Sequence, residues 1–299
     1  PPPEPAIASC LVGSVMCIRD RSSPSAPHVE LSNSGPIIHF SHANGYPPLA
    51  YRAMLSPFES SHKVIASLHR PLWPQFEEPN SLHSWKQLGE DVQSLLAEAN
   101  GPVISIGHSM GSAAILMAAV QKPEYFRKIV LIEPVLVPRF LIFMLRALPF
   151  FARRAWPLAR QTSQRVNRWI DKDAAFDHFR PKRVFKRISD DVLWDYVNEG
   201  TFVNESGEYE LIFTREWELQ CYLKVRSCWD LFKLLKVPSL IIRGSESNTL
   251  SERAWSRLKK ISPQSEYIEI PNSGHLVPFE RPEICLLYTS DAADEGLGV

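Results

Sequence analysis

Short apolar runs alternate with longer stretches of helical periodicity along most of the chain. Between two of these runs, residues 82–100 carry apolar side chains at helical spacing and predict an amphipathic helix. The runs are continuous rather than alternating, which is typical of strands buried on both faces. We therefore expect an α/β fold, a mostly parallel sheet covered by helices on both faces. The predicted strands are residues 36–40, 63–67, 103–106, 129–132, 239–242 and 267–270.

One stretch breaks this rhythm. Residues 134–236 show no good strand pattern and many bulky and basic side chains, so we expect a helical cap inserted into the sheet domain. The core is then residues 22–133 together with 237–284. One part of the insertion is either a helix packed on the core with arginines in solvent, or an apolar pocket wall or weak membrane-surface contact. Its apolar residues are Phe140, Leu141, Phe143, Met144, Leu148, Phe150, Phe151 and Trp156, interleaved with Arg139, Arg146, Arg153, Arg154 and Arg160.

Charge and hydropathy argue against two classes of protein, nucleic-acid binders and membrane-inserted proteins. The 299 residues carry 33 basic and 33 acidic side chains, and this neutral balance argues against a dedicated nucleic-acid partner. The most apolar long stretch, residues 136–158, is interrupted by prolines and arginines, so no stable membrane insertion is expected. The composition leaves the oligomeric state open.

The two ends of the chain share an unusual relationship. Residues 16–21 and 285–290 can be encoded by DNA segments that are reverse complements of each other. With their flanks, they resemble the inverted ends of a transposon-based sequencing adapter. We therefore expect residues 1–21 and 285–299 to be foreign tails, and exclude them from fold reasoning. A gene cloned from source DNA should lack both segments.

Cysteine usage bears on the compartment and on metals. Three of the five cysteines fall in or beside the predicted tails, which leaves Cys221 and Cys228. Two cysteines form neither a disulfide framework nor a metal cluster, so a reducing compartment, the cytoplasm, is expected. The chain has no glycine-rich phosphate loop and no clustered metal-ligand spacing, so we expect no cofactor and no metal.

The strongest chemical motif is Gly107-x-Ser109-x-Gly111, between a predicted strand and a run of small residues. This is the context of a nucleophile elbow, a turn so tight that the residues flanking the serine must be tiny. The serine then stands at the carboxyl end of the sheet, above a helix N-terminus that favours developing negative charge. Ser109 is the predicted nucleophile.

From residue 36 to residue 282 the chain resembles the α/β-hydrolase superfamily, in its serine-nucleophile branch. The motifs that carry the resemblance are Asn44-Gly45-Tyr46, the elbow around Ser109, and Ser273-Gly274-His275, in that order. The resemblance implies that His275, in the loop after the last strand, is the general base. It also implies that the backbone amides of Tyr46 and Met110 form the oxyanion hole, with Asn44, Gly45, Gly107 and Gly111 as supporting motif residues.

The acid of the triad is the point at which the pattern departs from the family. Family members commonly carry an aspartate shortly after the glycine that corresponds to Gly244, and this chain has none there. Two carboxylates compete for the role. We favour Glu133, at the end of the strand after the nucleophile helix, and keep Glu246 as the alternative. His108, beside the nucleophile, is interpreted as structural.

These residues predict a serine hydrolase that cleaves a small to medium apolar carboxylic ester through an acyl-enzyme intermediate. A carbon–carbon bond hydrolase or an acyltransferase could use the same triad. A third alternative is a non-catalytic binding protein built on the same fold, because fold does not determine function.

Overall fold

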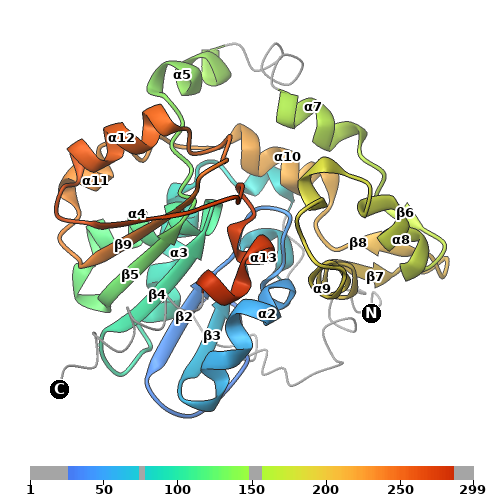
Figure 1. Ribbon diagram of the computed structural model, residues 1–299, viewed down its shortest axis with the longest axis horizontal. Coiled ribbons are helices and arrows are strands. Elements are labelled where there is room, and N and C mark those ends of the chain that lie inside the picture. The colour runs from blue at the N-terminus through green and yellow to red at the C-terminus, as the bar shows by residue number, and fades with distance from the viewer. Residues whose placement is uncertain (1–25, 74–77, 148–156, 286–299) are drawn as a thin grey trace.

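The computed structural model describes residues 26–73, 78–147 and 157–285. Its centre is a seven-stranded sheet in the order β1-β3-β2-β4-β5-β9-β10 (Figure 1). Only β1 is antiparallel to its neighbour, and the other pairs are parallel. The prediction of a mostly parallel sheet is therefore confirmed. The strands are β1 (His28–Glu30), β2 (Ile37–Ser41), β3 (Lys63–Ser67), β4 (Val103–His108), β5 (Phe126–Ile132), β9 (Ser239–Gly244) and β10 (Glu266–Ile270).

The central strands are buried on both faces, and most of their side chains are apolar. All six residues of β4 are buried, as are all six of β9. In the parallel register, Ser41 lies opposite Gly107, and Ile132 lies opposite Ile242. The carboxyl ends of β2, β4, β5 and β9 thus meet at one edge of the sheet, where a parallel sheet offers its binding crevice.

Helices cover both faces of the sheet (Figure 1). One face packs against the helices α3 (Lys86–Leu96), α4 (Met110–Gln121), α11 (Leu231–Leu234) and α12 (Glu252–Ile261). The other face packs against α2 (Arg52–Leu55), α13 (Val277–Glu280) and part of the insertion. Short 3-10 turns connect these elements: η2 (Pro48–Tyr51), η3 (Ser56–Ser60), η4 (Arg70–Leu72), η5 (Pro79–Ser81), η6 (Pro123–Tyr125) and η7 (Arg183–Phe185).

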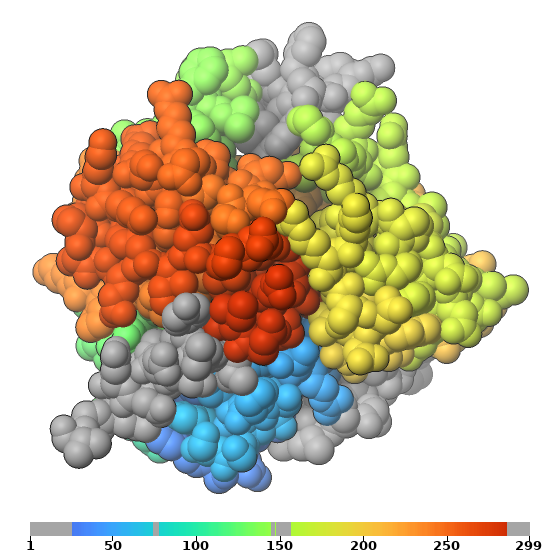
Figure 2. Space-filling view, viewed as in Figure 1, coloured from blue at the N-terminus to red at the C-terminus, as the bar shows by residue number. Residues whose placement is uncertain are grey.

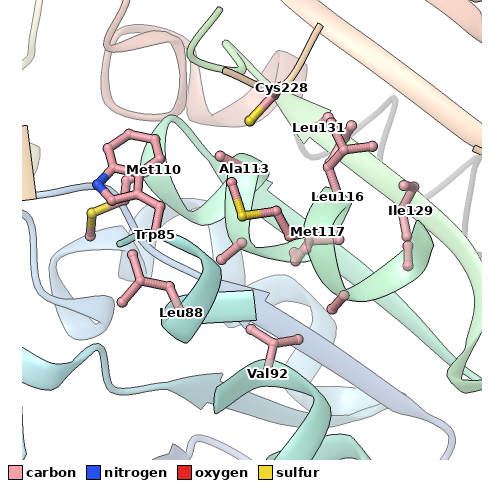
Figure 3. Close-up of a cluster of buried hydrophobic side chains, with 14 of the residues drawn as sticks. Trp85, Leu88, Val92, Met110, Ala113, Leu116, Met117, Ile129, Leu131 and Cys228 are labelled. Atoms are coloured by element: carbon pink, nitrogen blue, oxygen red, sulfur yellow. The ribbon is translucent and has the colours of Figure 1, made fainter. Parts of the chain in front are cut away.

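Helix α3 carries the predicted amphipathic stripe, although it is shorter than the predicted residues 82–100. Its buried face packs on α4, where Leu88 and Val92 lie close to Met117 (Figure 3). Gly89 permits this close approach, because a Cβ there would lie only 2.8 Å from the Cβ of Met117. The contact holds α4, and with it the residue that precedes α4, firmly against the sheet.

The insertion contains the helices α5 (Arg139–Ala147), α7 (Pro157–Gln164), α8 (Lys172–Phe179), α9 (Asp190–Gly200) and α10 (Arg215–Leu223). It also contains a three-stranded antiparallel sheet, with the order β6 (Arg168–Trp169), β8 (Tyr209–Leu211), β7 (Thr201–Val203). The expectation that this stretch has no strand was therefore wrong. Strands of two or three residues are too short to show an alternating pattern in the sequence. In Figure 2 part of the insertion, coloured yellow, lies beside the C-terminal part of the core, coloured orange and red.

Helix α10 is tied to the core by backbone acceptors. The Trp85 indole donates to the carbonyl of Cys221 at 2.8 Å, and the Gln220 amide donates to the carbonyl of Leu82 at 2.9 Å. The Asn44 side chain donates to the carbonyl of Glu218 at 3.1 Å. Helix α10 is therefore a fixed element of the insertion.

The aromatic stretch singled out in the sequence is only partly described. Phe140 and Phe143 on α5 are 74% and 66% exposed, whereas Ile142 between them is buried. Arg139, the first residue of the same helix, forms an ion pair with Asp230. Leu148, Phe150, Phe151, Trp156, Arg153 and Arg154 lie outside the described residues.

No helix among the described residues is long and apolar enough to cross a membrane. The predicted foreign tails lie outside the described residues except for Cys285, which is fully buried against the core. Cys221 and Cys228 are also buried, and both carry free thiols. Burial raises the pKa of the Cys228 thiol to about 12, so it stays protonated and unreactive near neutral pH.

Candidate active site

Ser109 lies between β4 and α4 with a backbone φ of 55°. A non-glycine residue in this region is strained, and such strain is a feature of the nucleophile elbow. The flanking glycines make the turn possible. A Cβ on Gly111 would lie 2.0 Å from the carbonyl oxygen of Ser41, and one on Gly107 would lie 2.7 Å from the amide nitrogen of Ser112.

His275 follows β10 and contacts the serine directly. Its Nε2 lies 2.9 Å from Ser109 Oγ. Its Nδ1 lies 3.0 Å from Glu133 Oε2. Since a carboxylate only accepts hydrogen bonds, Nδ1 carries the proton in the neutral ring and Nε2 is free to accept from the serine hydroxyl.

Glu133 follows β5 with a φ of 51° and is fully buried. Besides His275, its carboxylate accepts from the backbone amide of Gly244 at 2.8 Å and from the hydroxyl of Ser247 at 2.6 Å. A buried carboxylate needs such donors to remain charged. Together with His275, these two donors hold the carboxylate in place.

Glu246, the alternative acid, points elsewhere. Its side chain is 49% exposed and pairs with Arg187 of the insertion. Ser247, the next residue, is the one that reaches Glu133. Sequence reasoning did not single out Ser247, and its only signal was its place in the loop after Gly244 where the family commonly carries the acid.

The two expected oxyanion donors differ in their present bonding. Met110 is the first residue of α4, and its amide has no acceptor among the residues that the structure describes. The Tyr46 amide donates to the Ala43 carbonyl across a turn, in a long bond of 3.3 Å. Gly45 has a φ of 82°, which glycine adopts without strain.

A directional chain of hydrogen bonds links the Asn44–Tyr46 loop to the loop of His275. The carbonyl of His275 accepts from His108 Nε2 at 2.9 Å, so His108 Nδ1 must be an acceptor. The Tyr51 hydroxyl donates to that Nδ1 at 2.8 Å and accepts from the Ala43 amide at 3.2 Å. Burial lowers the pKa of His108 well below its usual value, which keeps the ring neutral. His108 faces away from Ser109 Oγ and bridges two loops of the site.

More buried histidines line this part of the sheet. His39 on β2 lies between the hydroxyls of Ser67 and Ser105, and burial lowers its pKa to about 3. His69 lies against His42, with ring centroids 4.4 Å apart, and burial lowers the pKa of His69 to about 4. These rings are neutral hydrogen-bonding groups within the fold.

Comparison with known protein families matches residues 40–286 to the alpha/beta hydrolase family. The match spans most of the chain, and the fold and the elbow geometry agree with it. The chain belongs to the alpha/beta hydrolase family.

Individual relatives are distant. The chain is 25% identical over 258 residues to the uncharacterized hydrolase YugF of Bacillus subtilis (strain 168), which covers 81% of this chain and 84% of that protein. The solved structure of E-2-(acetamidomethylene)succinate hydrolase matches with a TM-score of 0.74 at 20% identity, over 90% of this chain and 94% of that one. An esterase of M. tuberculosis matches with a TM-score of 0.70 at 16% identity, over 97% and 96%. These structural matches establish the shared fold.

Proposed function

We propose that this protein is a serine hydrolase that cleaves carboxylic esters through an acyl-enzyme, with Ser109, His275 and Glu133 as its triad. One observation carries the proposal: a continuous line of contacts from Ser109 Oγ to His275 Nε2 at 2.9 Å, and from His275 Nδ1 to Glu133 Oε2 at 3.0 Å. These are the distances at which a base can take a proton from a nucleophile and a carboxylate can orient that base.

In the proposed acylation step, Ser109 Oγ attacks the carbonyl carbon of the ester as its proton moves to His275 Nε2. The carbonyl oxygen becomes an oxyanion, which accepts from the amides of Met110 and Tyr46. The Tyr46 amide gives up its long bond to Ala43 to reach it. The intermediate then collapses, the bond to the alcohol oxygen breaks, and His275 returns the proton to the leaving alcohol.

Deacylation repeats the sequence with water in place of the alcohol. His275 takes a proton from the water, the resulting hydroxide attacks the acyl carbon, and the proton passes to Ser109 Oγ as the acid leaves. Throughout, Glu133 stays ionised and stabilises the imidazolium that forms twice in each cycle. Its burial and its donors from Gly244 and Ser247 support Glu133 rather than Glu246 in this role.

We also propose the domain division that the sequence predicts, with residues 22–133 and 237–284 as the catalytic core and residues 134–236 as the cap over it. We also propose a reducing compartment, the cytoplasm, for this protein. The free, fully buried thiols of Cys221 and Cys228 support that assignment.

An alternative is the hydrolysis of a bond other than an ester by the same triad. The solved structure with a TM-score of 0.74 is by name a hydrolase of an acetamidomethylene succinate, which contains no ester. Attack of Ser109 on such a carbonyl needs the same base and the same oxyanion donors.

The test is hydrolysis of p-nitrophenyl esters of increasing acyl length by the purified chain, with two matched serine variants. Ser109→Ala should abolish hydrolysis, whereas Ser256→Ala, on the exposed face of α12, should leave it unchanged. Hydrolysis that survives in Ser109→Ala would refute the assignment of the nucleophile. A folded wild-type protein that hydrolyses no ester would contradict the proposed ester hydrolysis and favour either the alternative substrates or a non-catalytic protein.

A further inference from the structure

The carboxylate of Glu218, on the fixed helix α10, lies directly over Gly45. A Cβ added to Gly45 would lie 3.4 Å from both the Cδ and the Oε2 of Glu218. Gly45 stands between Asn44 and Tyr46, and the Tyr46 amide is a proposed oxyanion donor. An ester whose carbonyl oxygen reaches that amide binds next to the loop in which Asn44 and Gly45 contact Glu218.

The charge at this place is balanced. Glu218 is 7% exposed, and Arg165 forms an ion pair with its Oε2. Its Oε1 lies 3.3 Å from the Thr162 hydroxyl and 3.4 Å from the Tyr222 hydroxyl. Burial raises the pKa of Glu218, and the neighbouring Arg165 opposes that rise. Since the pair is neutral as a whole, it gives a charged ligand no uncompensated partner.

Asn44, beside this pair, and Arg165, within it, each have a buried polar atom that lacks a hydrogen-bond partner among the described residues. The Asn44 side chain is 7% exposed and must direct its NH₂ toward the Glu218 carbonyl, because only the NH₂ can donate. Its Oδ1 is buried without a hydrogen-bond partner among the described residues. The Nε of Arg165 is likewise buried without an acceptor in the described part of the chain. A buried polar group in this state destabilises the protein unless something else satisfies it.

The Tyr46 hydroxyl is a further polar group on the same loop. The Tyr46 ring lies 5.2 Å from that of Tyr196 and 5.2 Å from that of Phe279, measured between centroids. Neither the Tyr46 nor the Tyr196 hydroxyl bonds to another described residue. Asn44 and Tyr46, which flank Gly45 in the sequence, thus carry one unpaired acceptor and one unpaired donor.

We propose that Asn44 and Tyr46, roofed by the Glu218–Arg165 pair, form a recognition site for an uncharged, hydroxyl-bearing part of the substrate. The substrate hydroxyl donates to Asn44 Oδ1 and accepts from the Tyr46 hydroxyl, so both protein groups gain a partner only when substrate is bound. This inference rests on the proposed function. It replaces the purely apolar ester expected from the sequence with one that carries a hydroxyl group.

The test compares esters that differ only in hydroxyl groups. One pair varies the acyl part, p-nitrophenyl 3-hydroxybutyrate against p-nitrophenyl butyrate. The other varies the alcohol, glycerol monobutyrate against propyl butyrate. In at least one pair we expect kcat/KM for the hydroxylated ester to be roughly tenfold higher or more, the worth of one net hydrogen bond.

Two variants and one control assign that preference to the site. The measured quantity is the ratio of kcat/KM for the hydroxylated ester to kcat/KM for its counterpart without the hydroxyl. Asn44→Ala should bring this ratio to within about threefold of one. Tyr46→Phe, which keeps the ring and the backbone amide, should lower the ratio at least about threefold. Gln220→Ala is the matched control, because it also removes one bond between α10 and the core but touches neither Asn44 nor Tyr46. Its ratio should equal that of the wild type.

The contrary outcomes are distinct. Equal kcat/KM within both pairs, or a preference that survives in both variants, would overturn the inference and leave the proposed function standing. A stronger preference for p-nitrophenyl hemisuccinate or for butyrylcholine would overturn it as well, because it would show a site for charge. If no ester is hydrolysed in a Ser109-dependent way, the proposed function fails, and this inference fails with it.

Discussion

Glu133 Oε2 lies 3.0 Å from His275 Nδ1, although the two residues follow different strands and are far apart in sequence. From this contact we predict that Glu133→Gln lowers kcat about 10²–10⁴-fold, because an amide can neither fix the right tautomer nor stabilise the imidazolium. Glu246→Gln, which removes one of the two carboxylates that pair with Arg187, should change kcat by less than about threefold. Steady-state kinetics on both variants decide the matter, and the opposite ranking would assign the acid to Glu246.

Ser247 should act as a positioning residue for Glu133. Its hydroxyl donates at 2.6 Å to the same oxygen that His275 contacts. Without this donor, the carboxylate can rotate away from the position in which it orients the His275 ring. We therefore expect Ser247→Ala to lower kcat about threefold to tenfold with little change in KM, because the imidazolium forms only after substrate has bound. The exposed neighbour Asn248→Ala is the control, and a Ser247→Ala variant with the kcat of the wild type would leave Ser247 with a structural role only.

Tyr51 should stabilise the site through both of its partners. Tyr51→Phe leaves the Ala43 amide and His108 Nδ1 without partners in a buried place. We expect the free energy of unfolding to fall by about 1–3 kcal/mol for each group left unsatisfied. Urea unfolding measures it, with Tyr125→Phe as the control, since the Tyr125 hydroxyl forms no hydrogen bond to a described residue. Equal midpoints for the two variants would show that the chain through His108 contributes nothing.

The buried histidines should make the protein sensitive to acid. Burial lowers the pKa of His39 to about 3 and that of His69 to about 4, from an ordinary value of 6.5. Below pH 6.5 the unfolded chain therefore binds protons that the native state does not, and stability falls as the pH drops toward 4. Above pH 6.5 the effect vanishes.

Unfolding in urea at several pH values tests this dependence. We expect a loss of at least about 3 kcal/mol between pH 7.5 and pH 4.5, since each pKa unit corresponds to about 1.4 kcal/mol. His39→Gln, which can keep hydrogen bonds to Ser67 and Ser105, should reduce the slope. A stability that stays constant down to pH 4.5 would contradict the assignment of these rings as neutral and buried.

Much of the fold could be predicted because its signals are local. Each predicted strand is a run of apolar residues, and the glycines around Ser109 mark a tight turn that few other residues permit. The three-residue β1 was missed because so short a segment has no periodicity, and the cap strands were missed for the same reason. Local pattern detects long elements only.

Contacts between distant residues could not be predicted in this way. Ser247 meets Glu133 only because β5 pairs with β9 and places both loops at one edge of the sheet. Asn44 meets Glu218 only because α10 folds back onto the core. Neither Ser247 nor Asn44 belongs to a sequence motif from which its partner could be predicted. A lone asparagine or serine in a loop is ordinarily a turn residue.

The most direct test of the central claim is reaction of the folded protein with a fluorophosphonate probe, because this reagent reports an activated serine whatever the natural substrate is. We predict a single adduct on Ser109, located by peptide mass spectrometry. The labelling should be at least about 100-fold slower in His275→Ala, because the base that activates the serine is gone. A folded wild-type protein that forms no adduct, or one that is labelled at another serine, would contradict the assignment of Ser109 as the nucleophile.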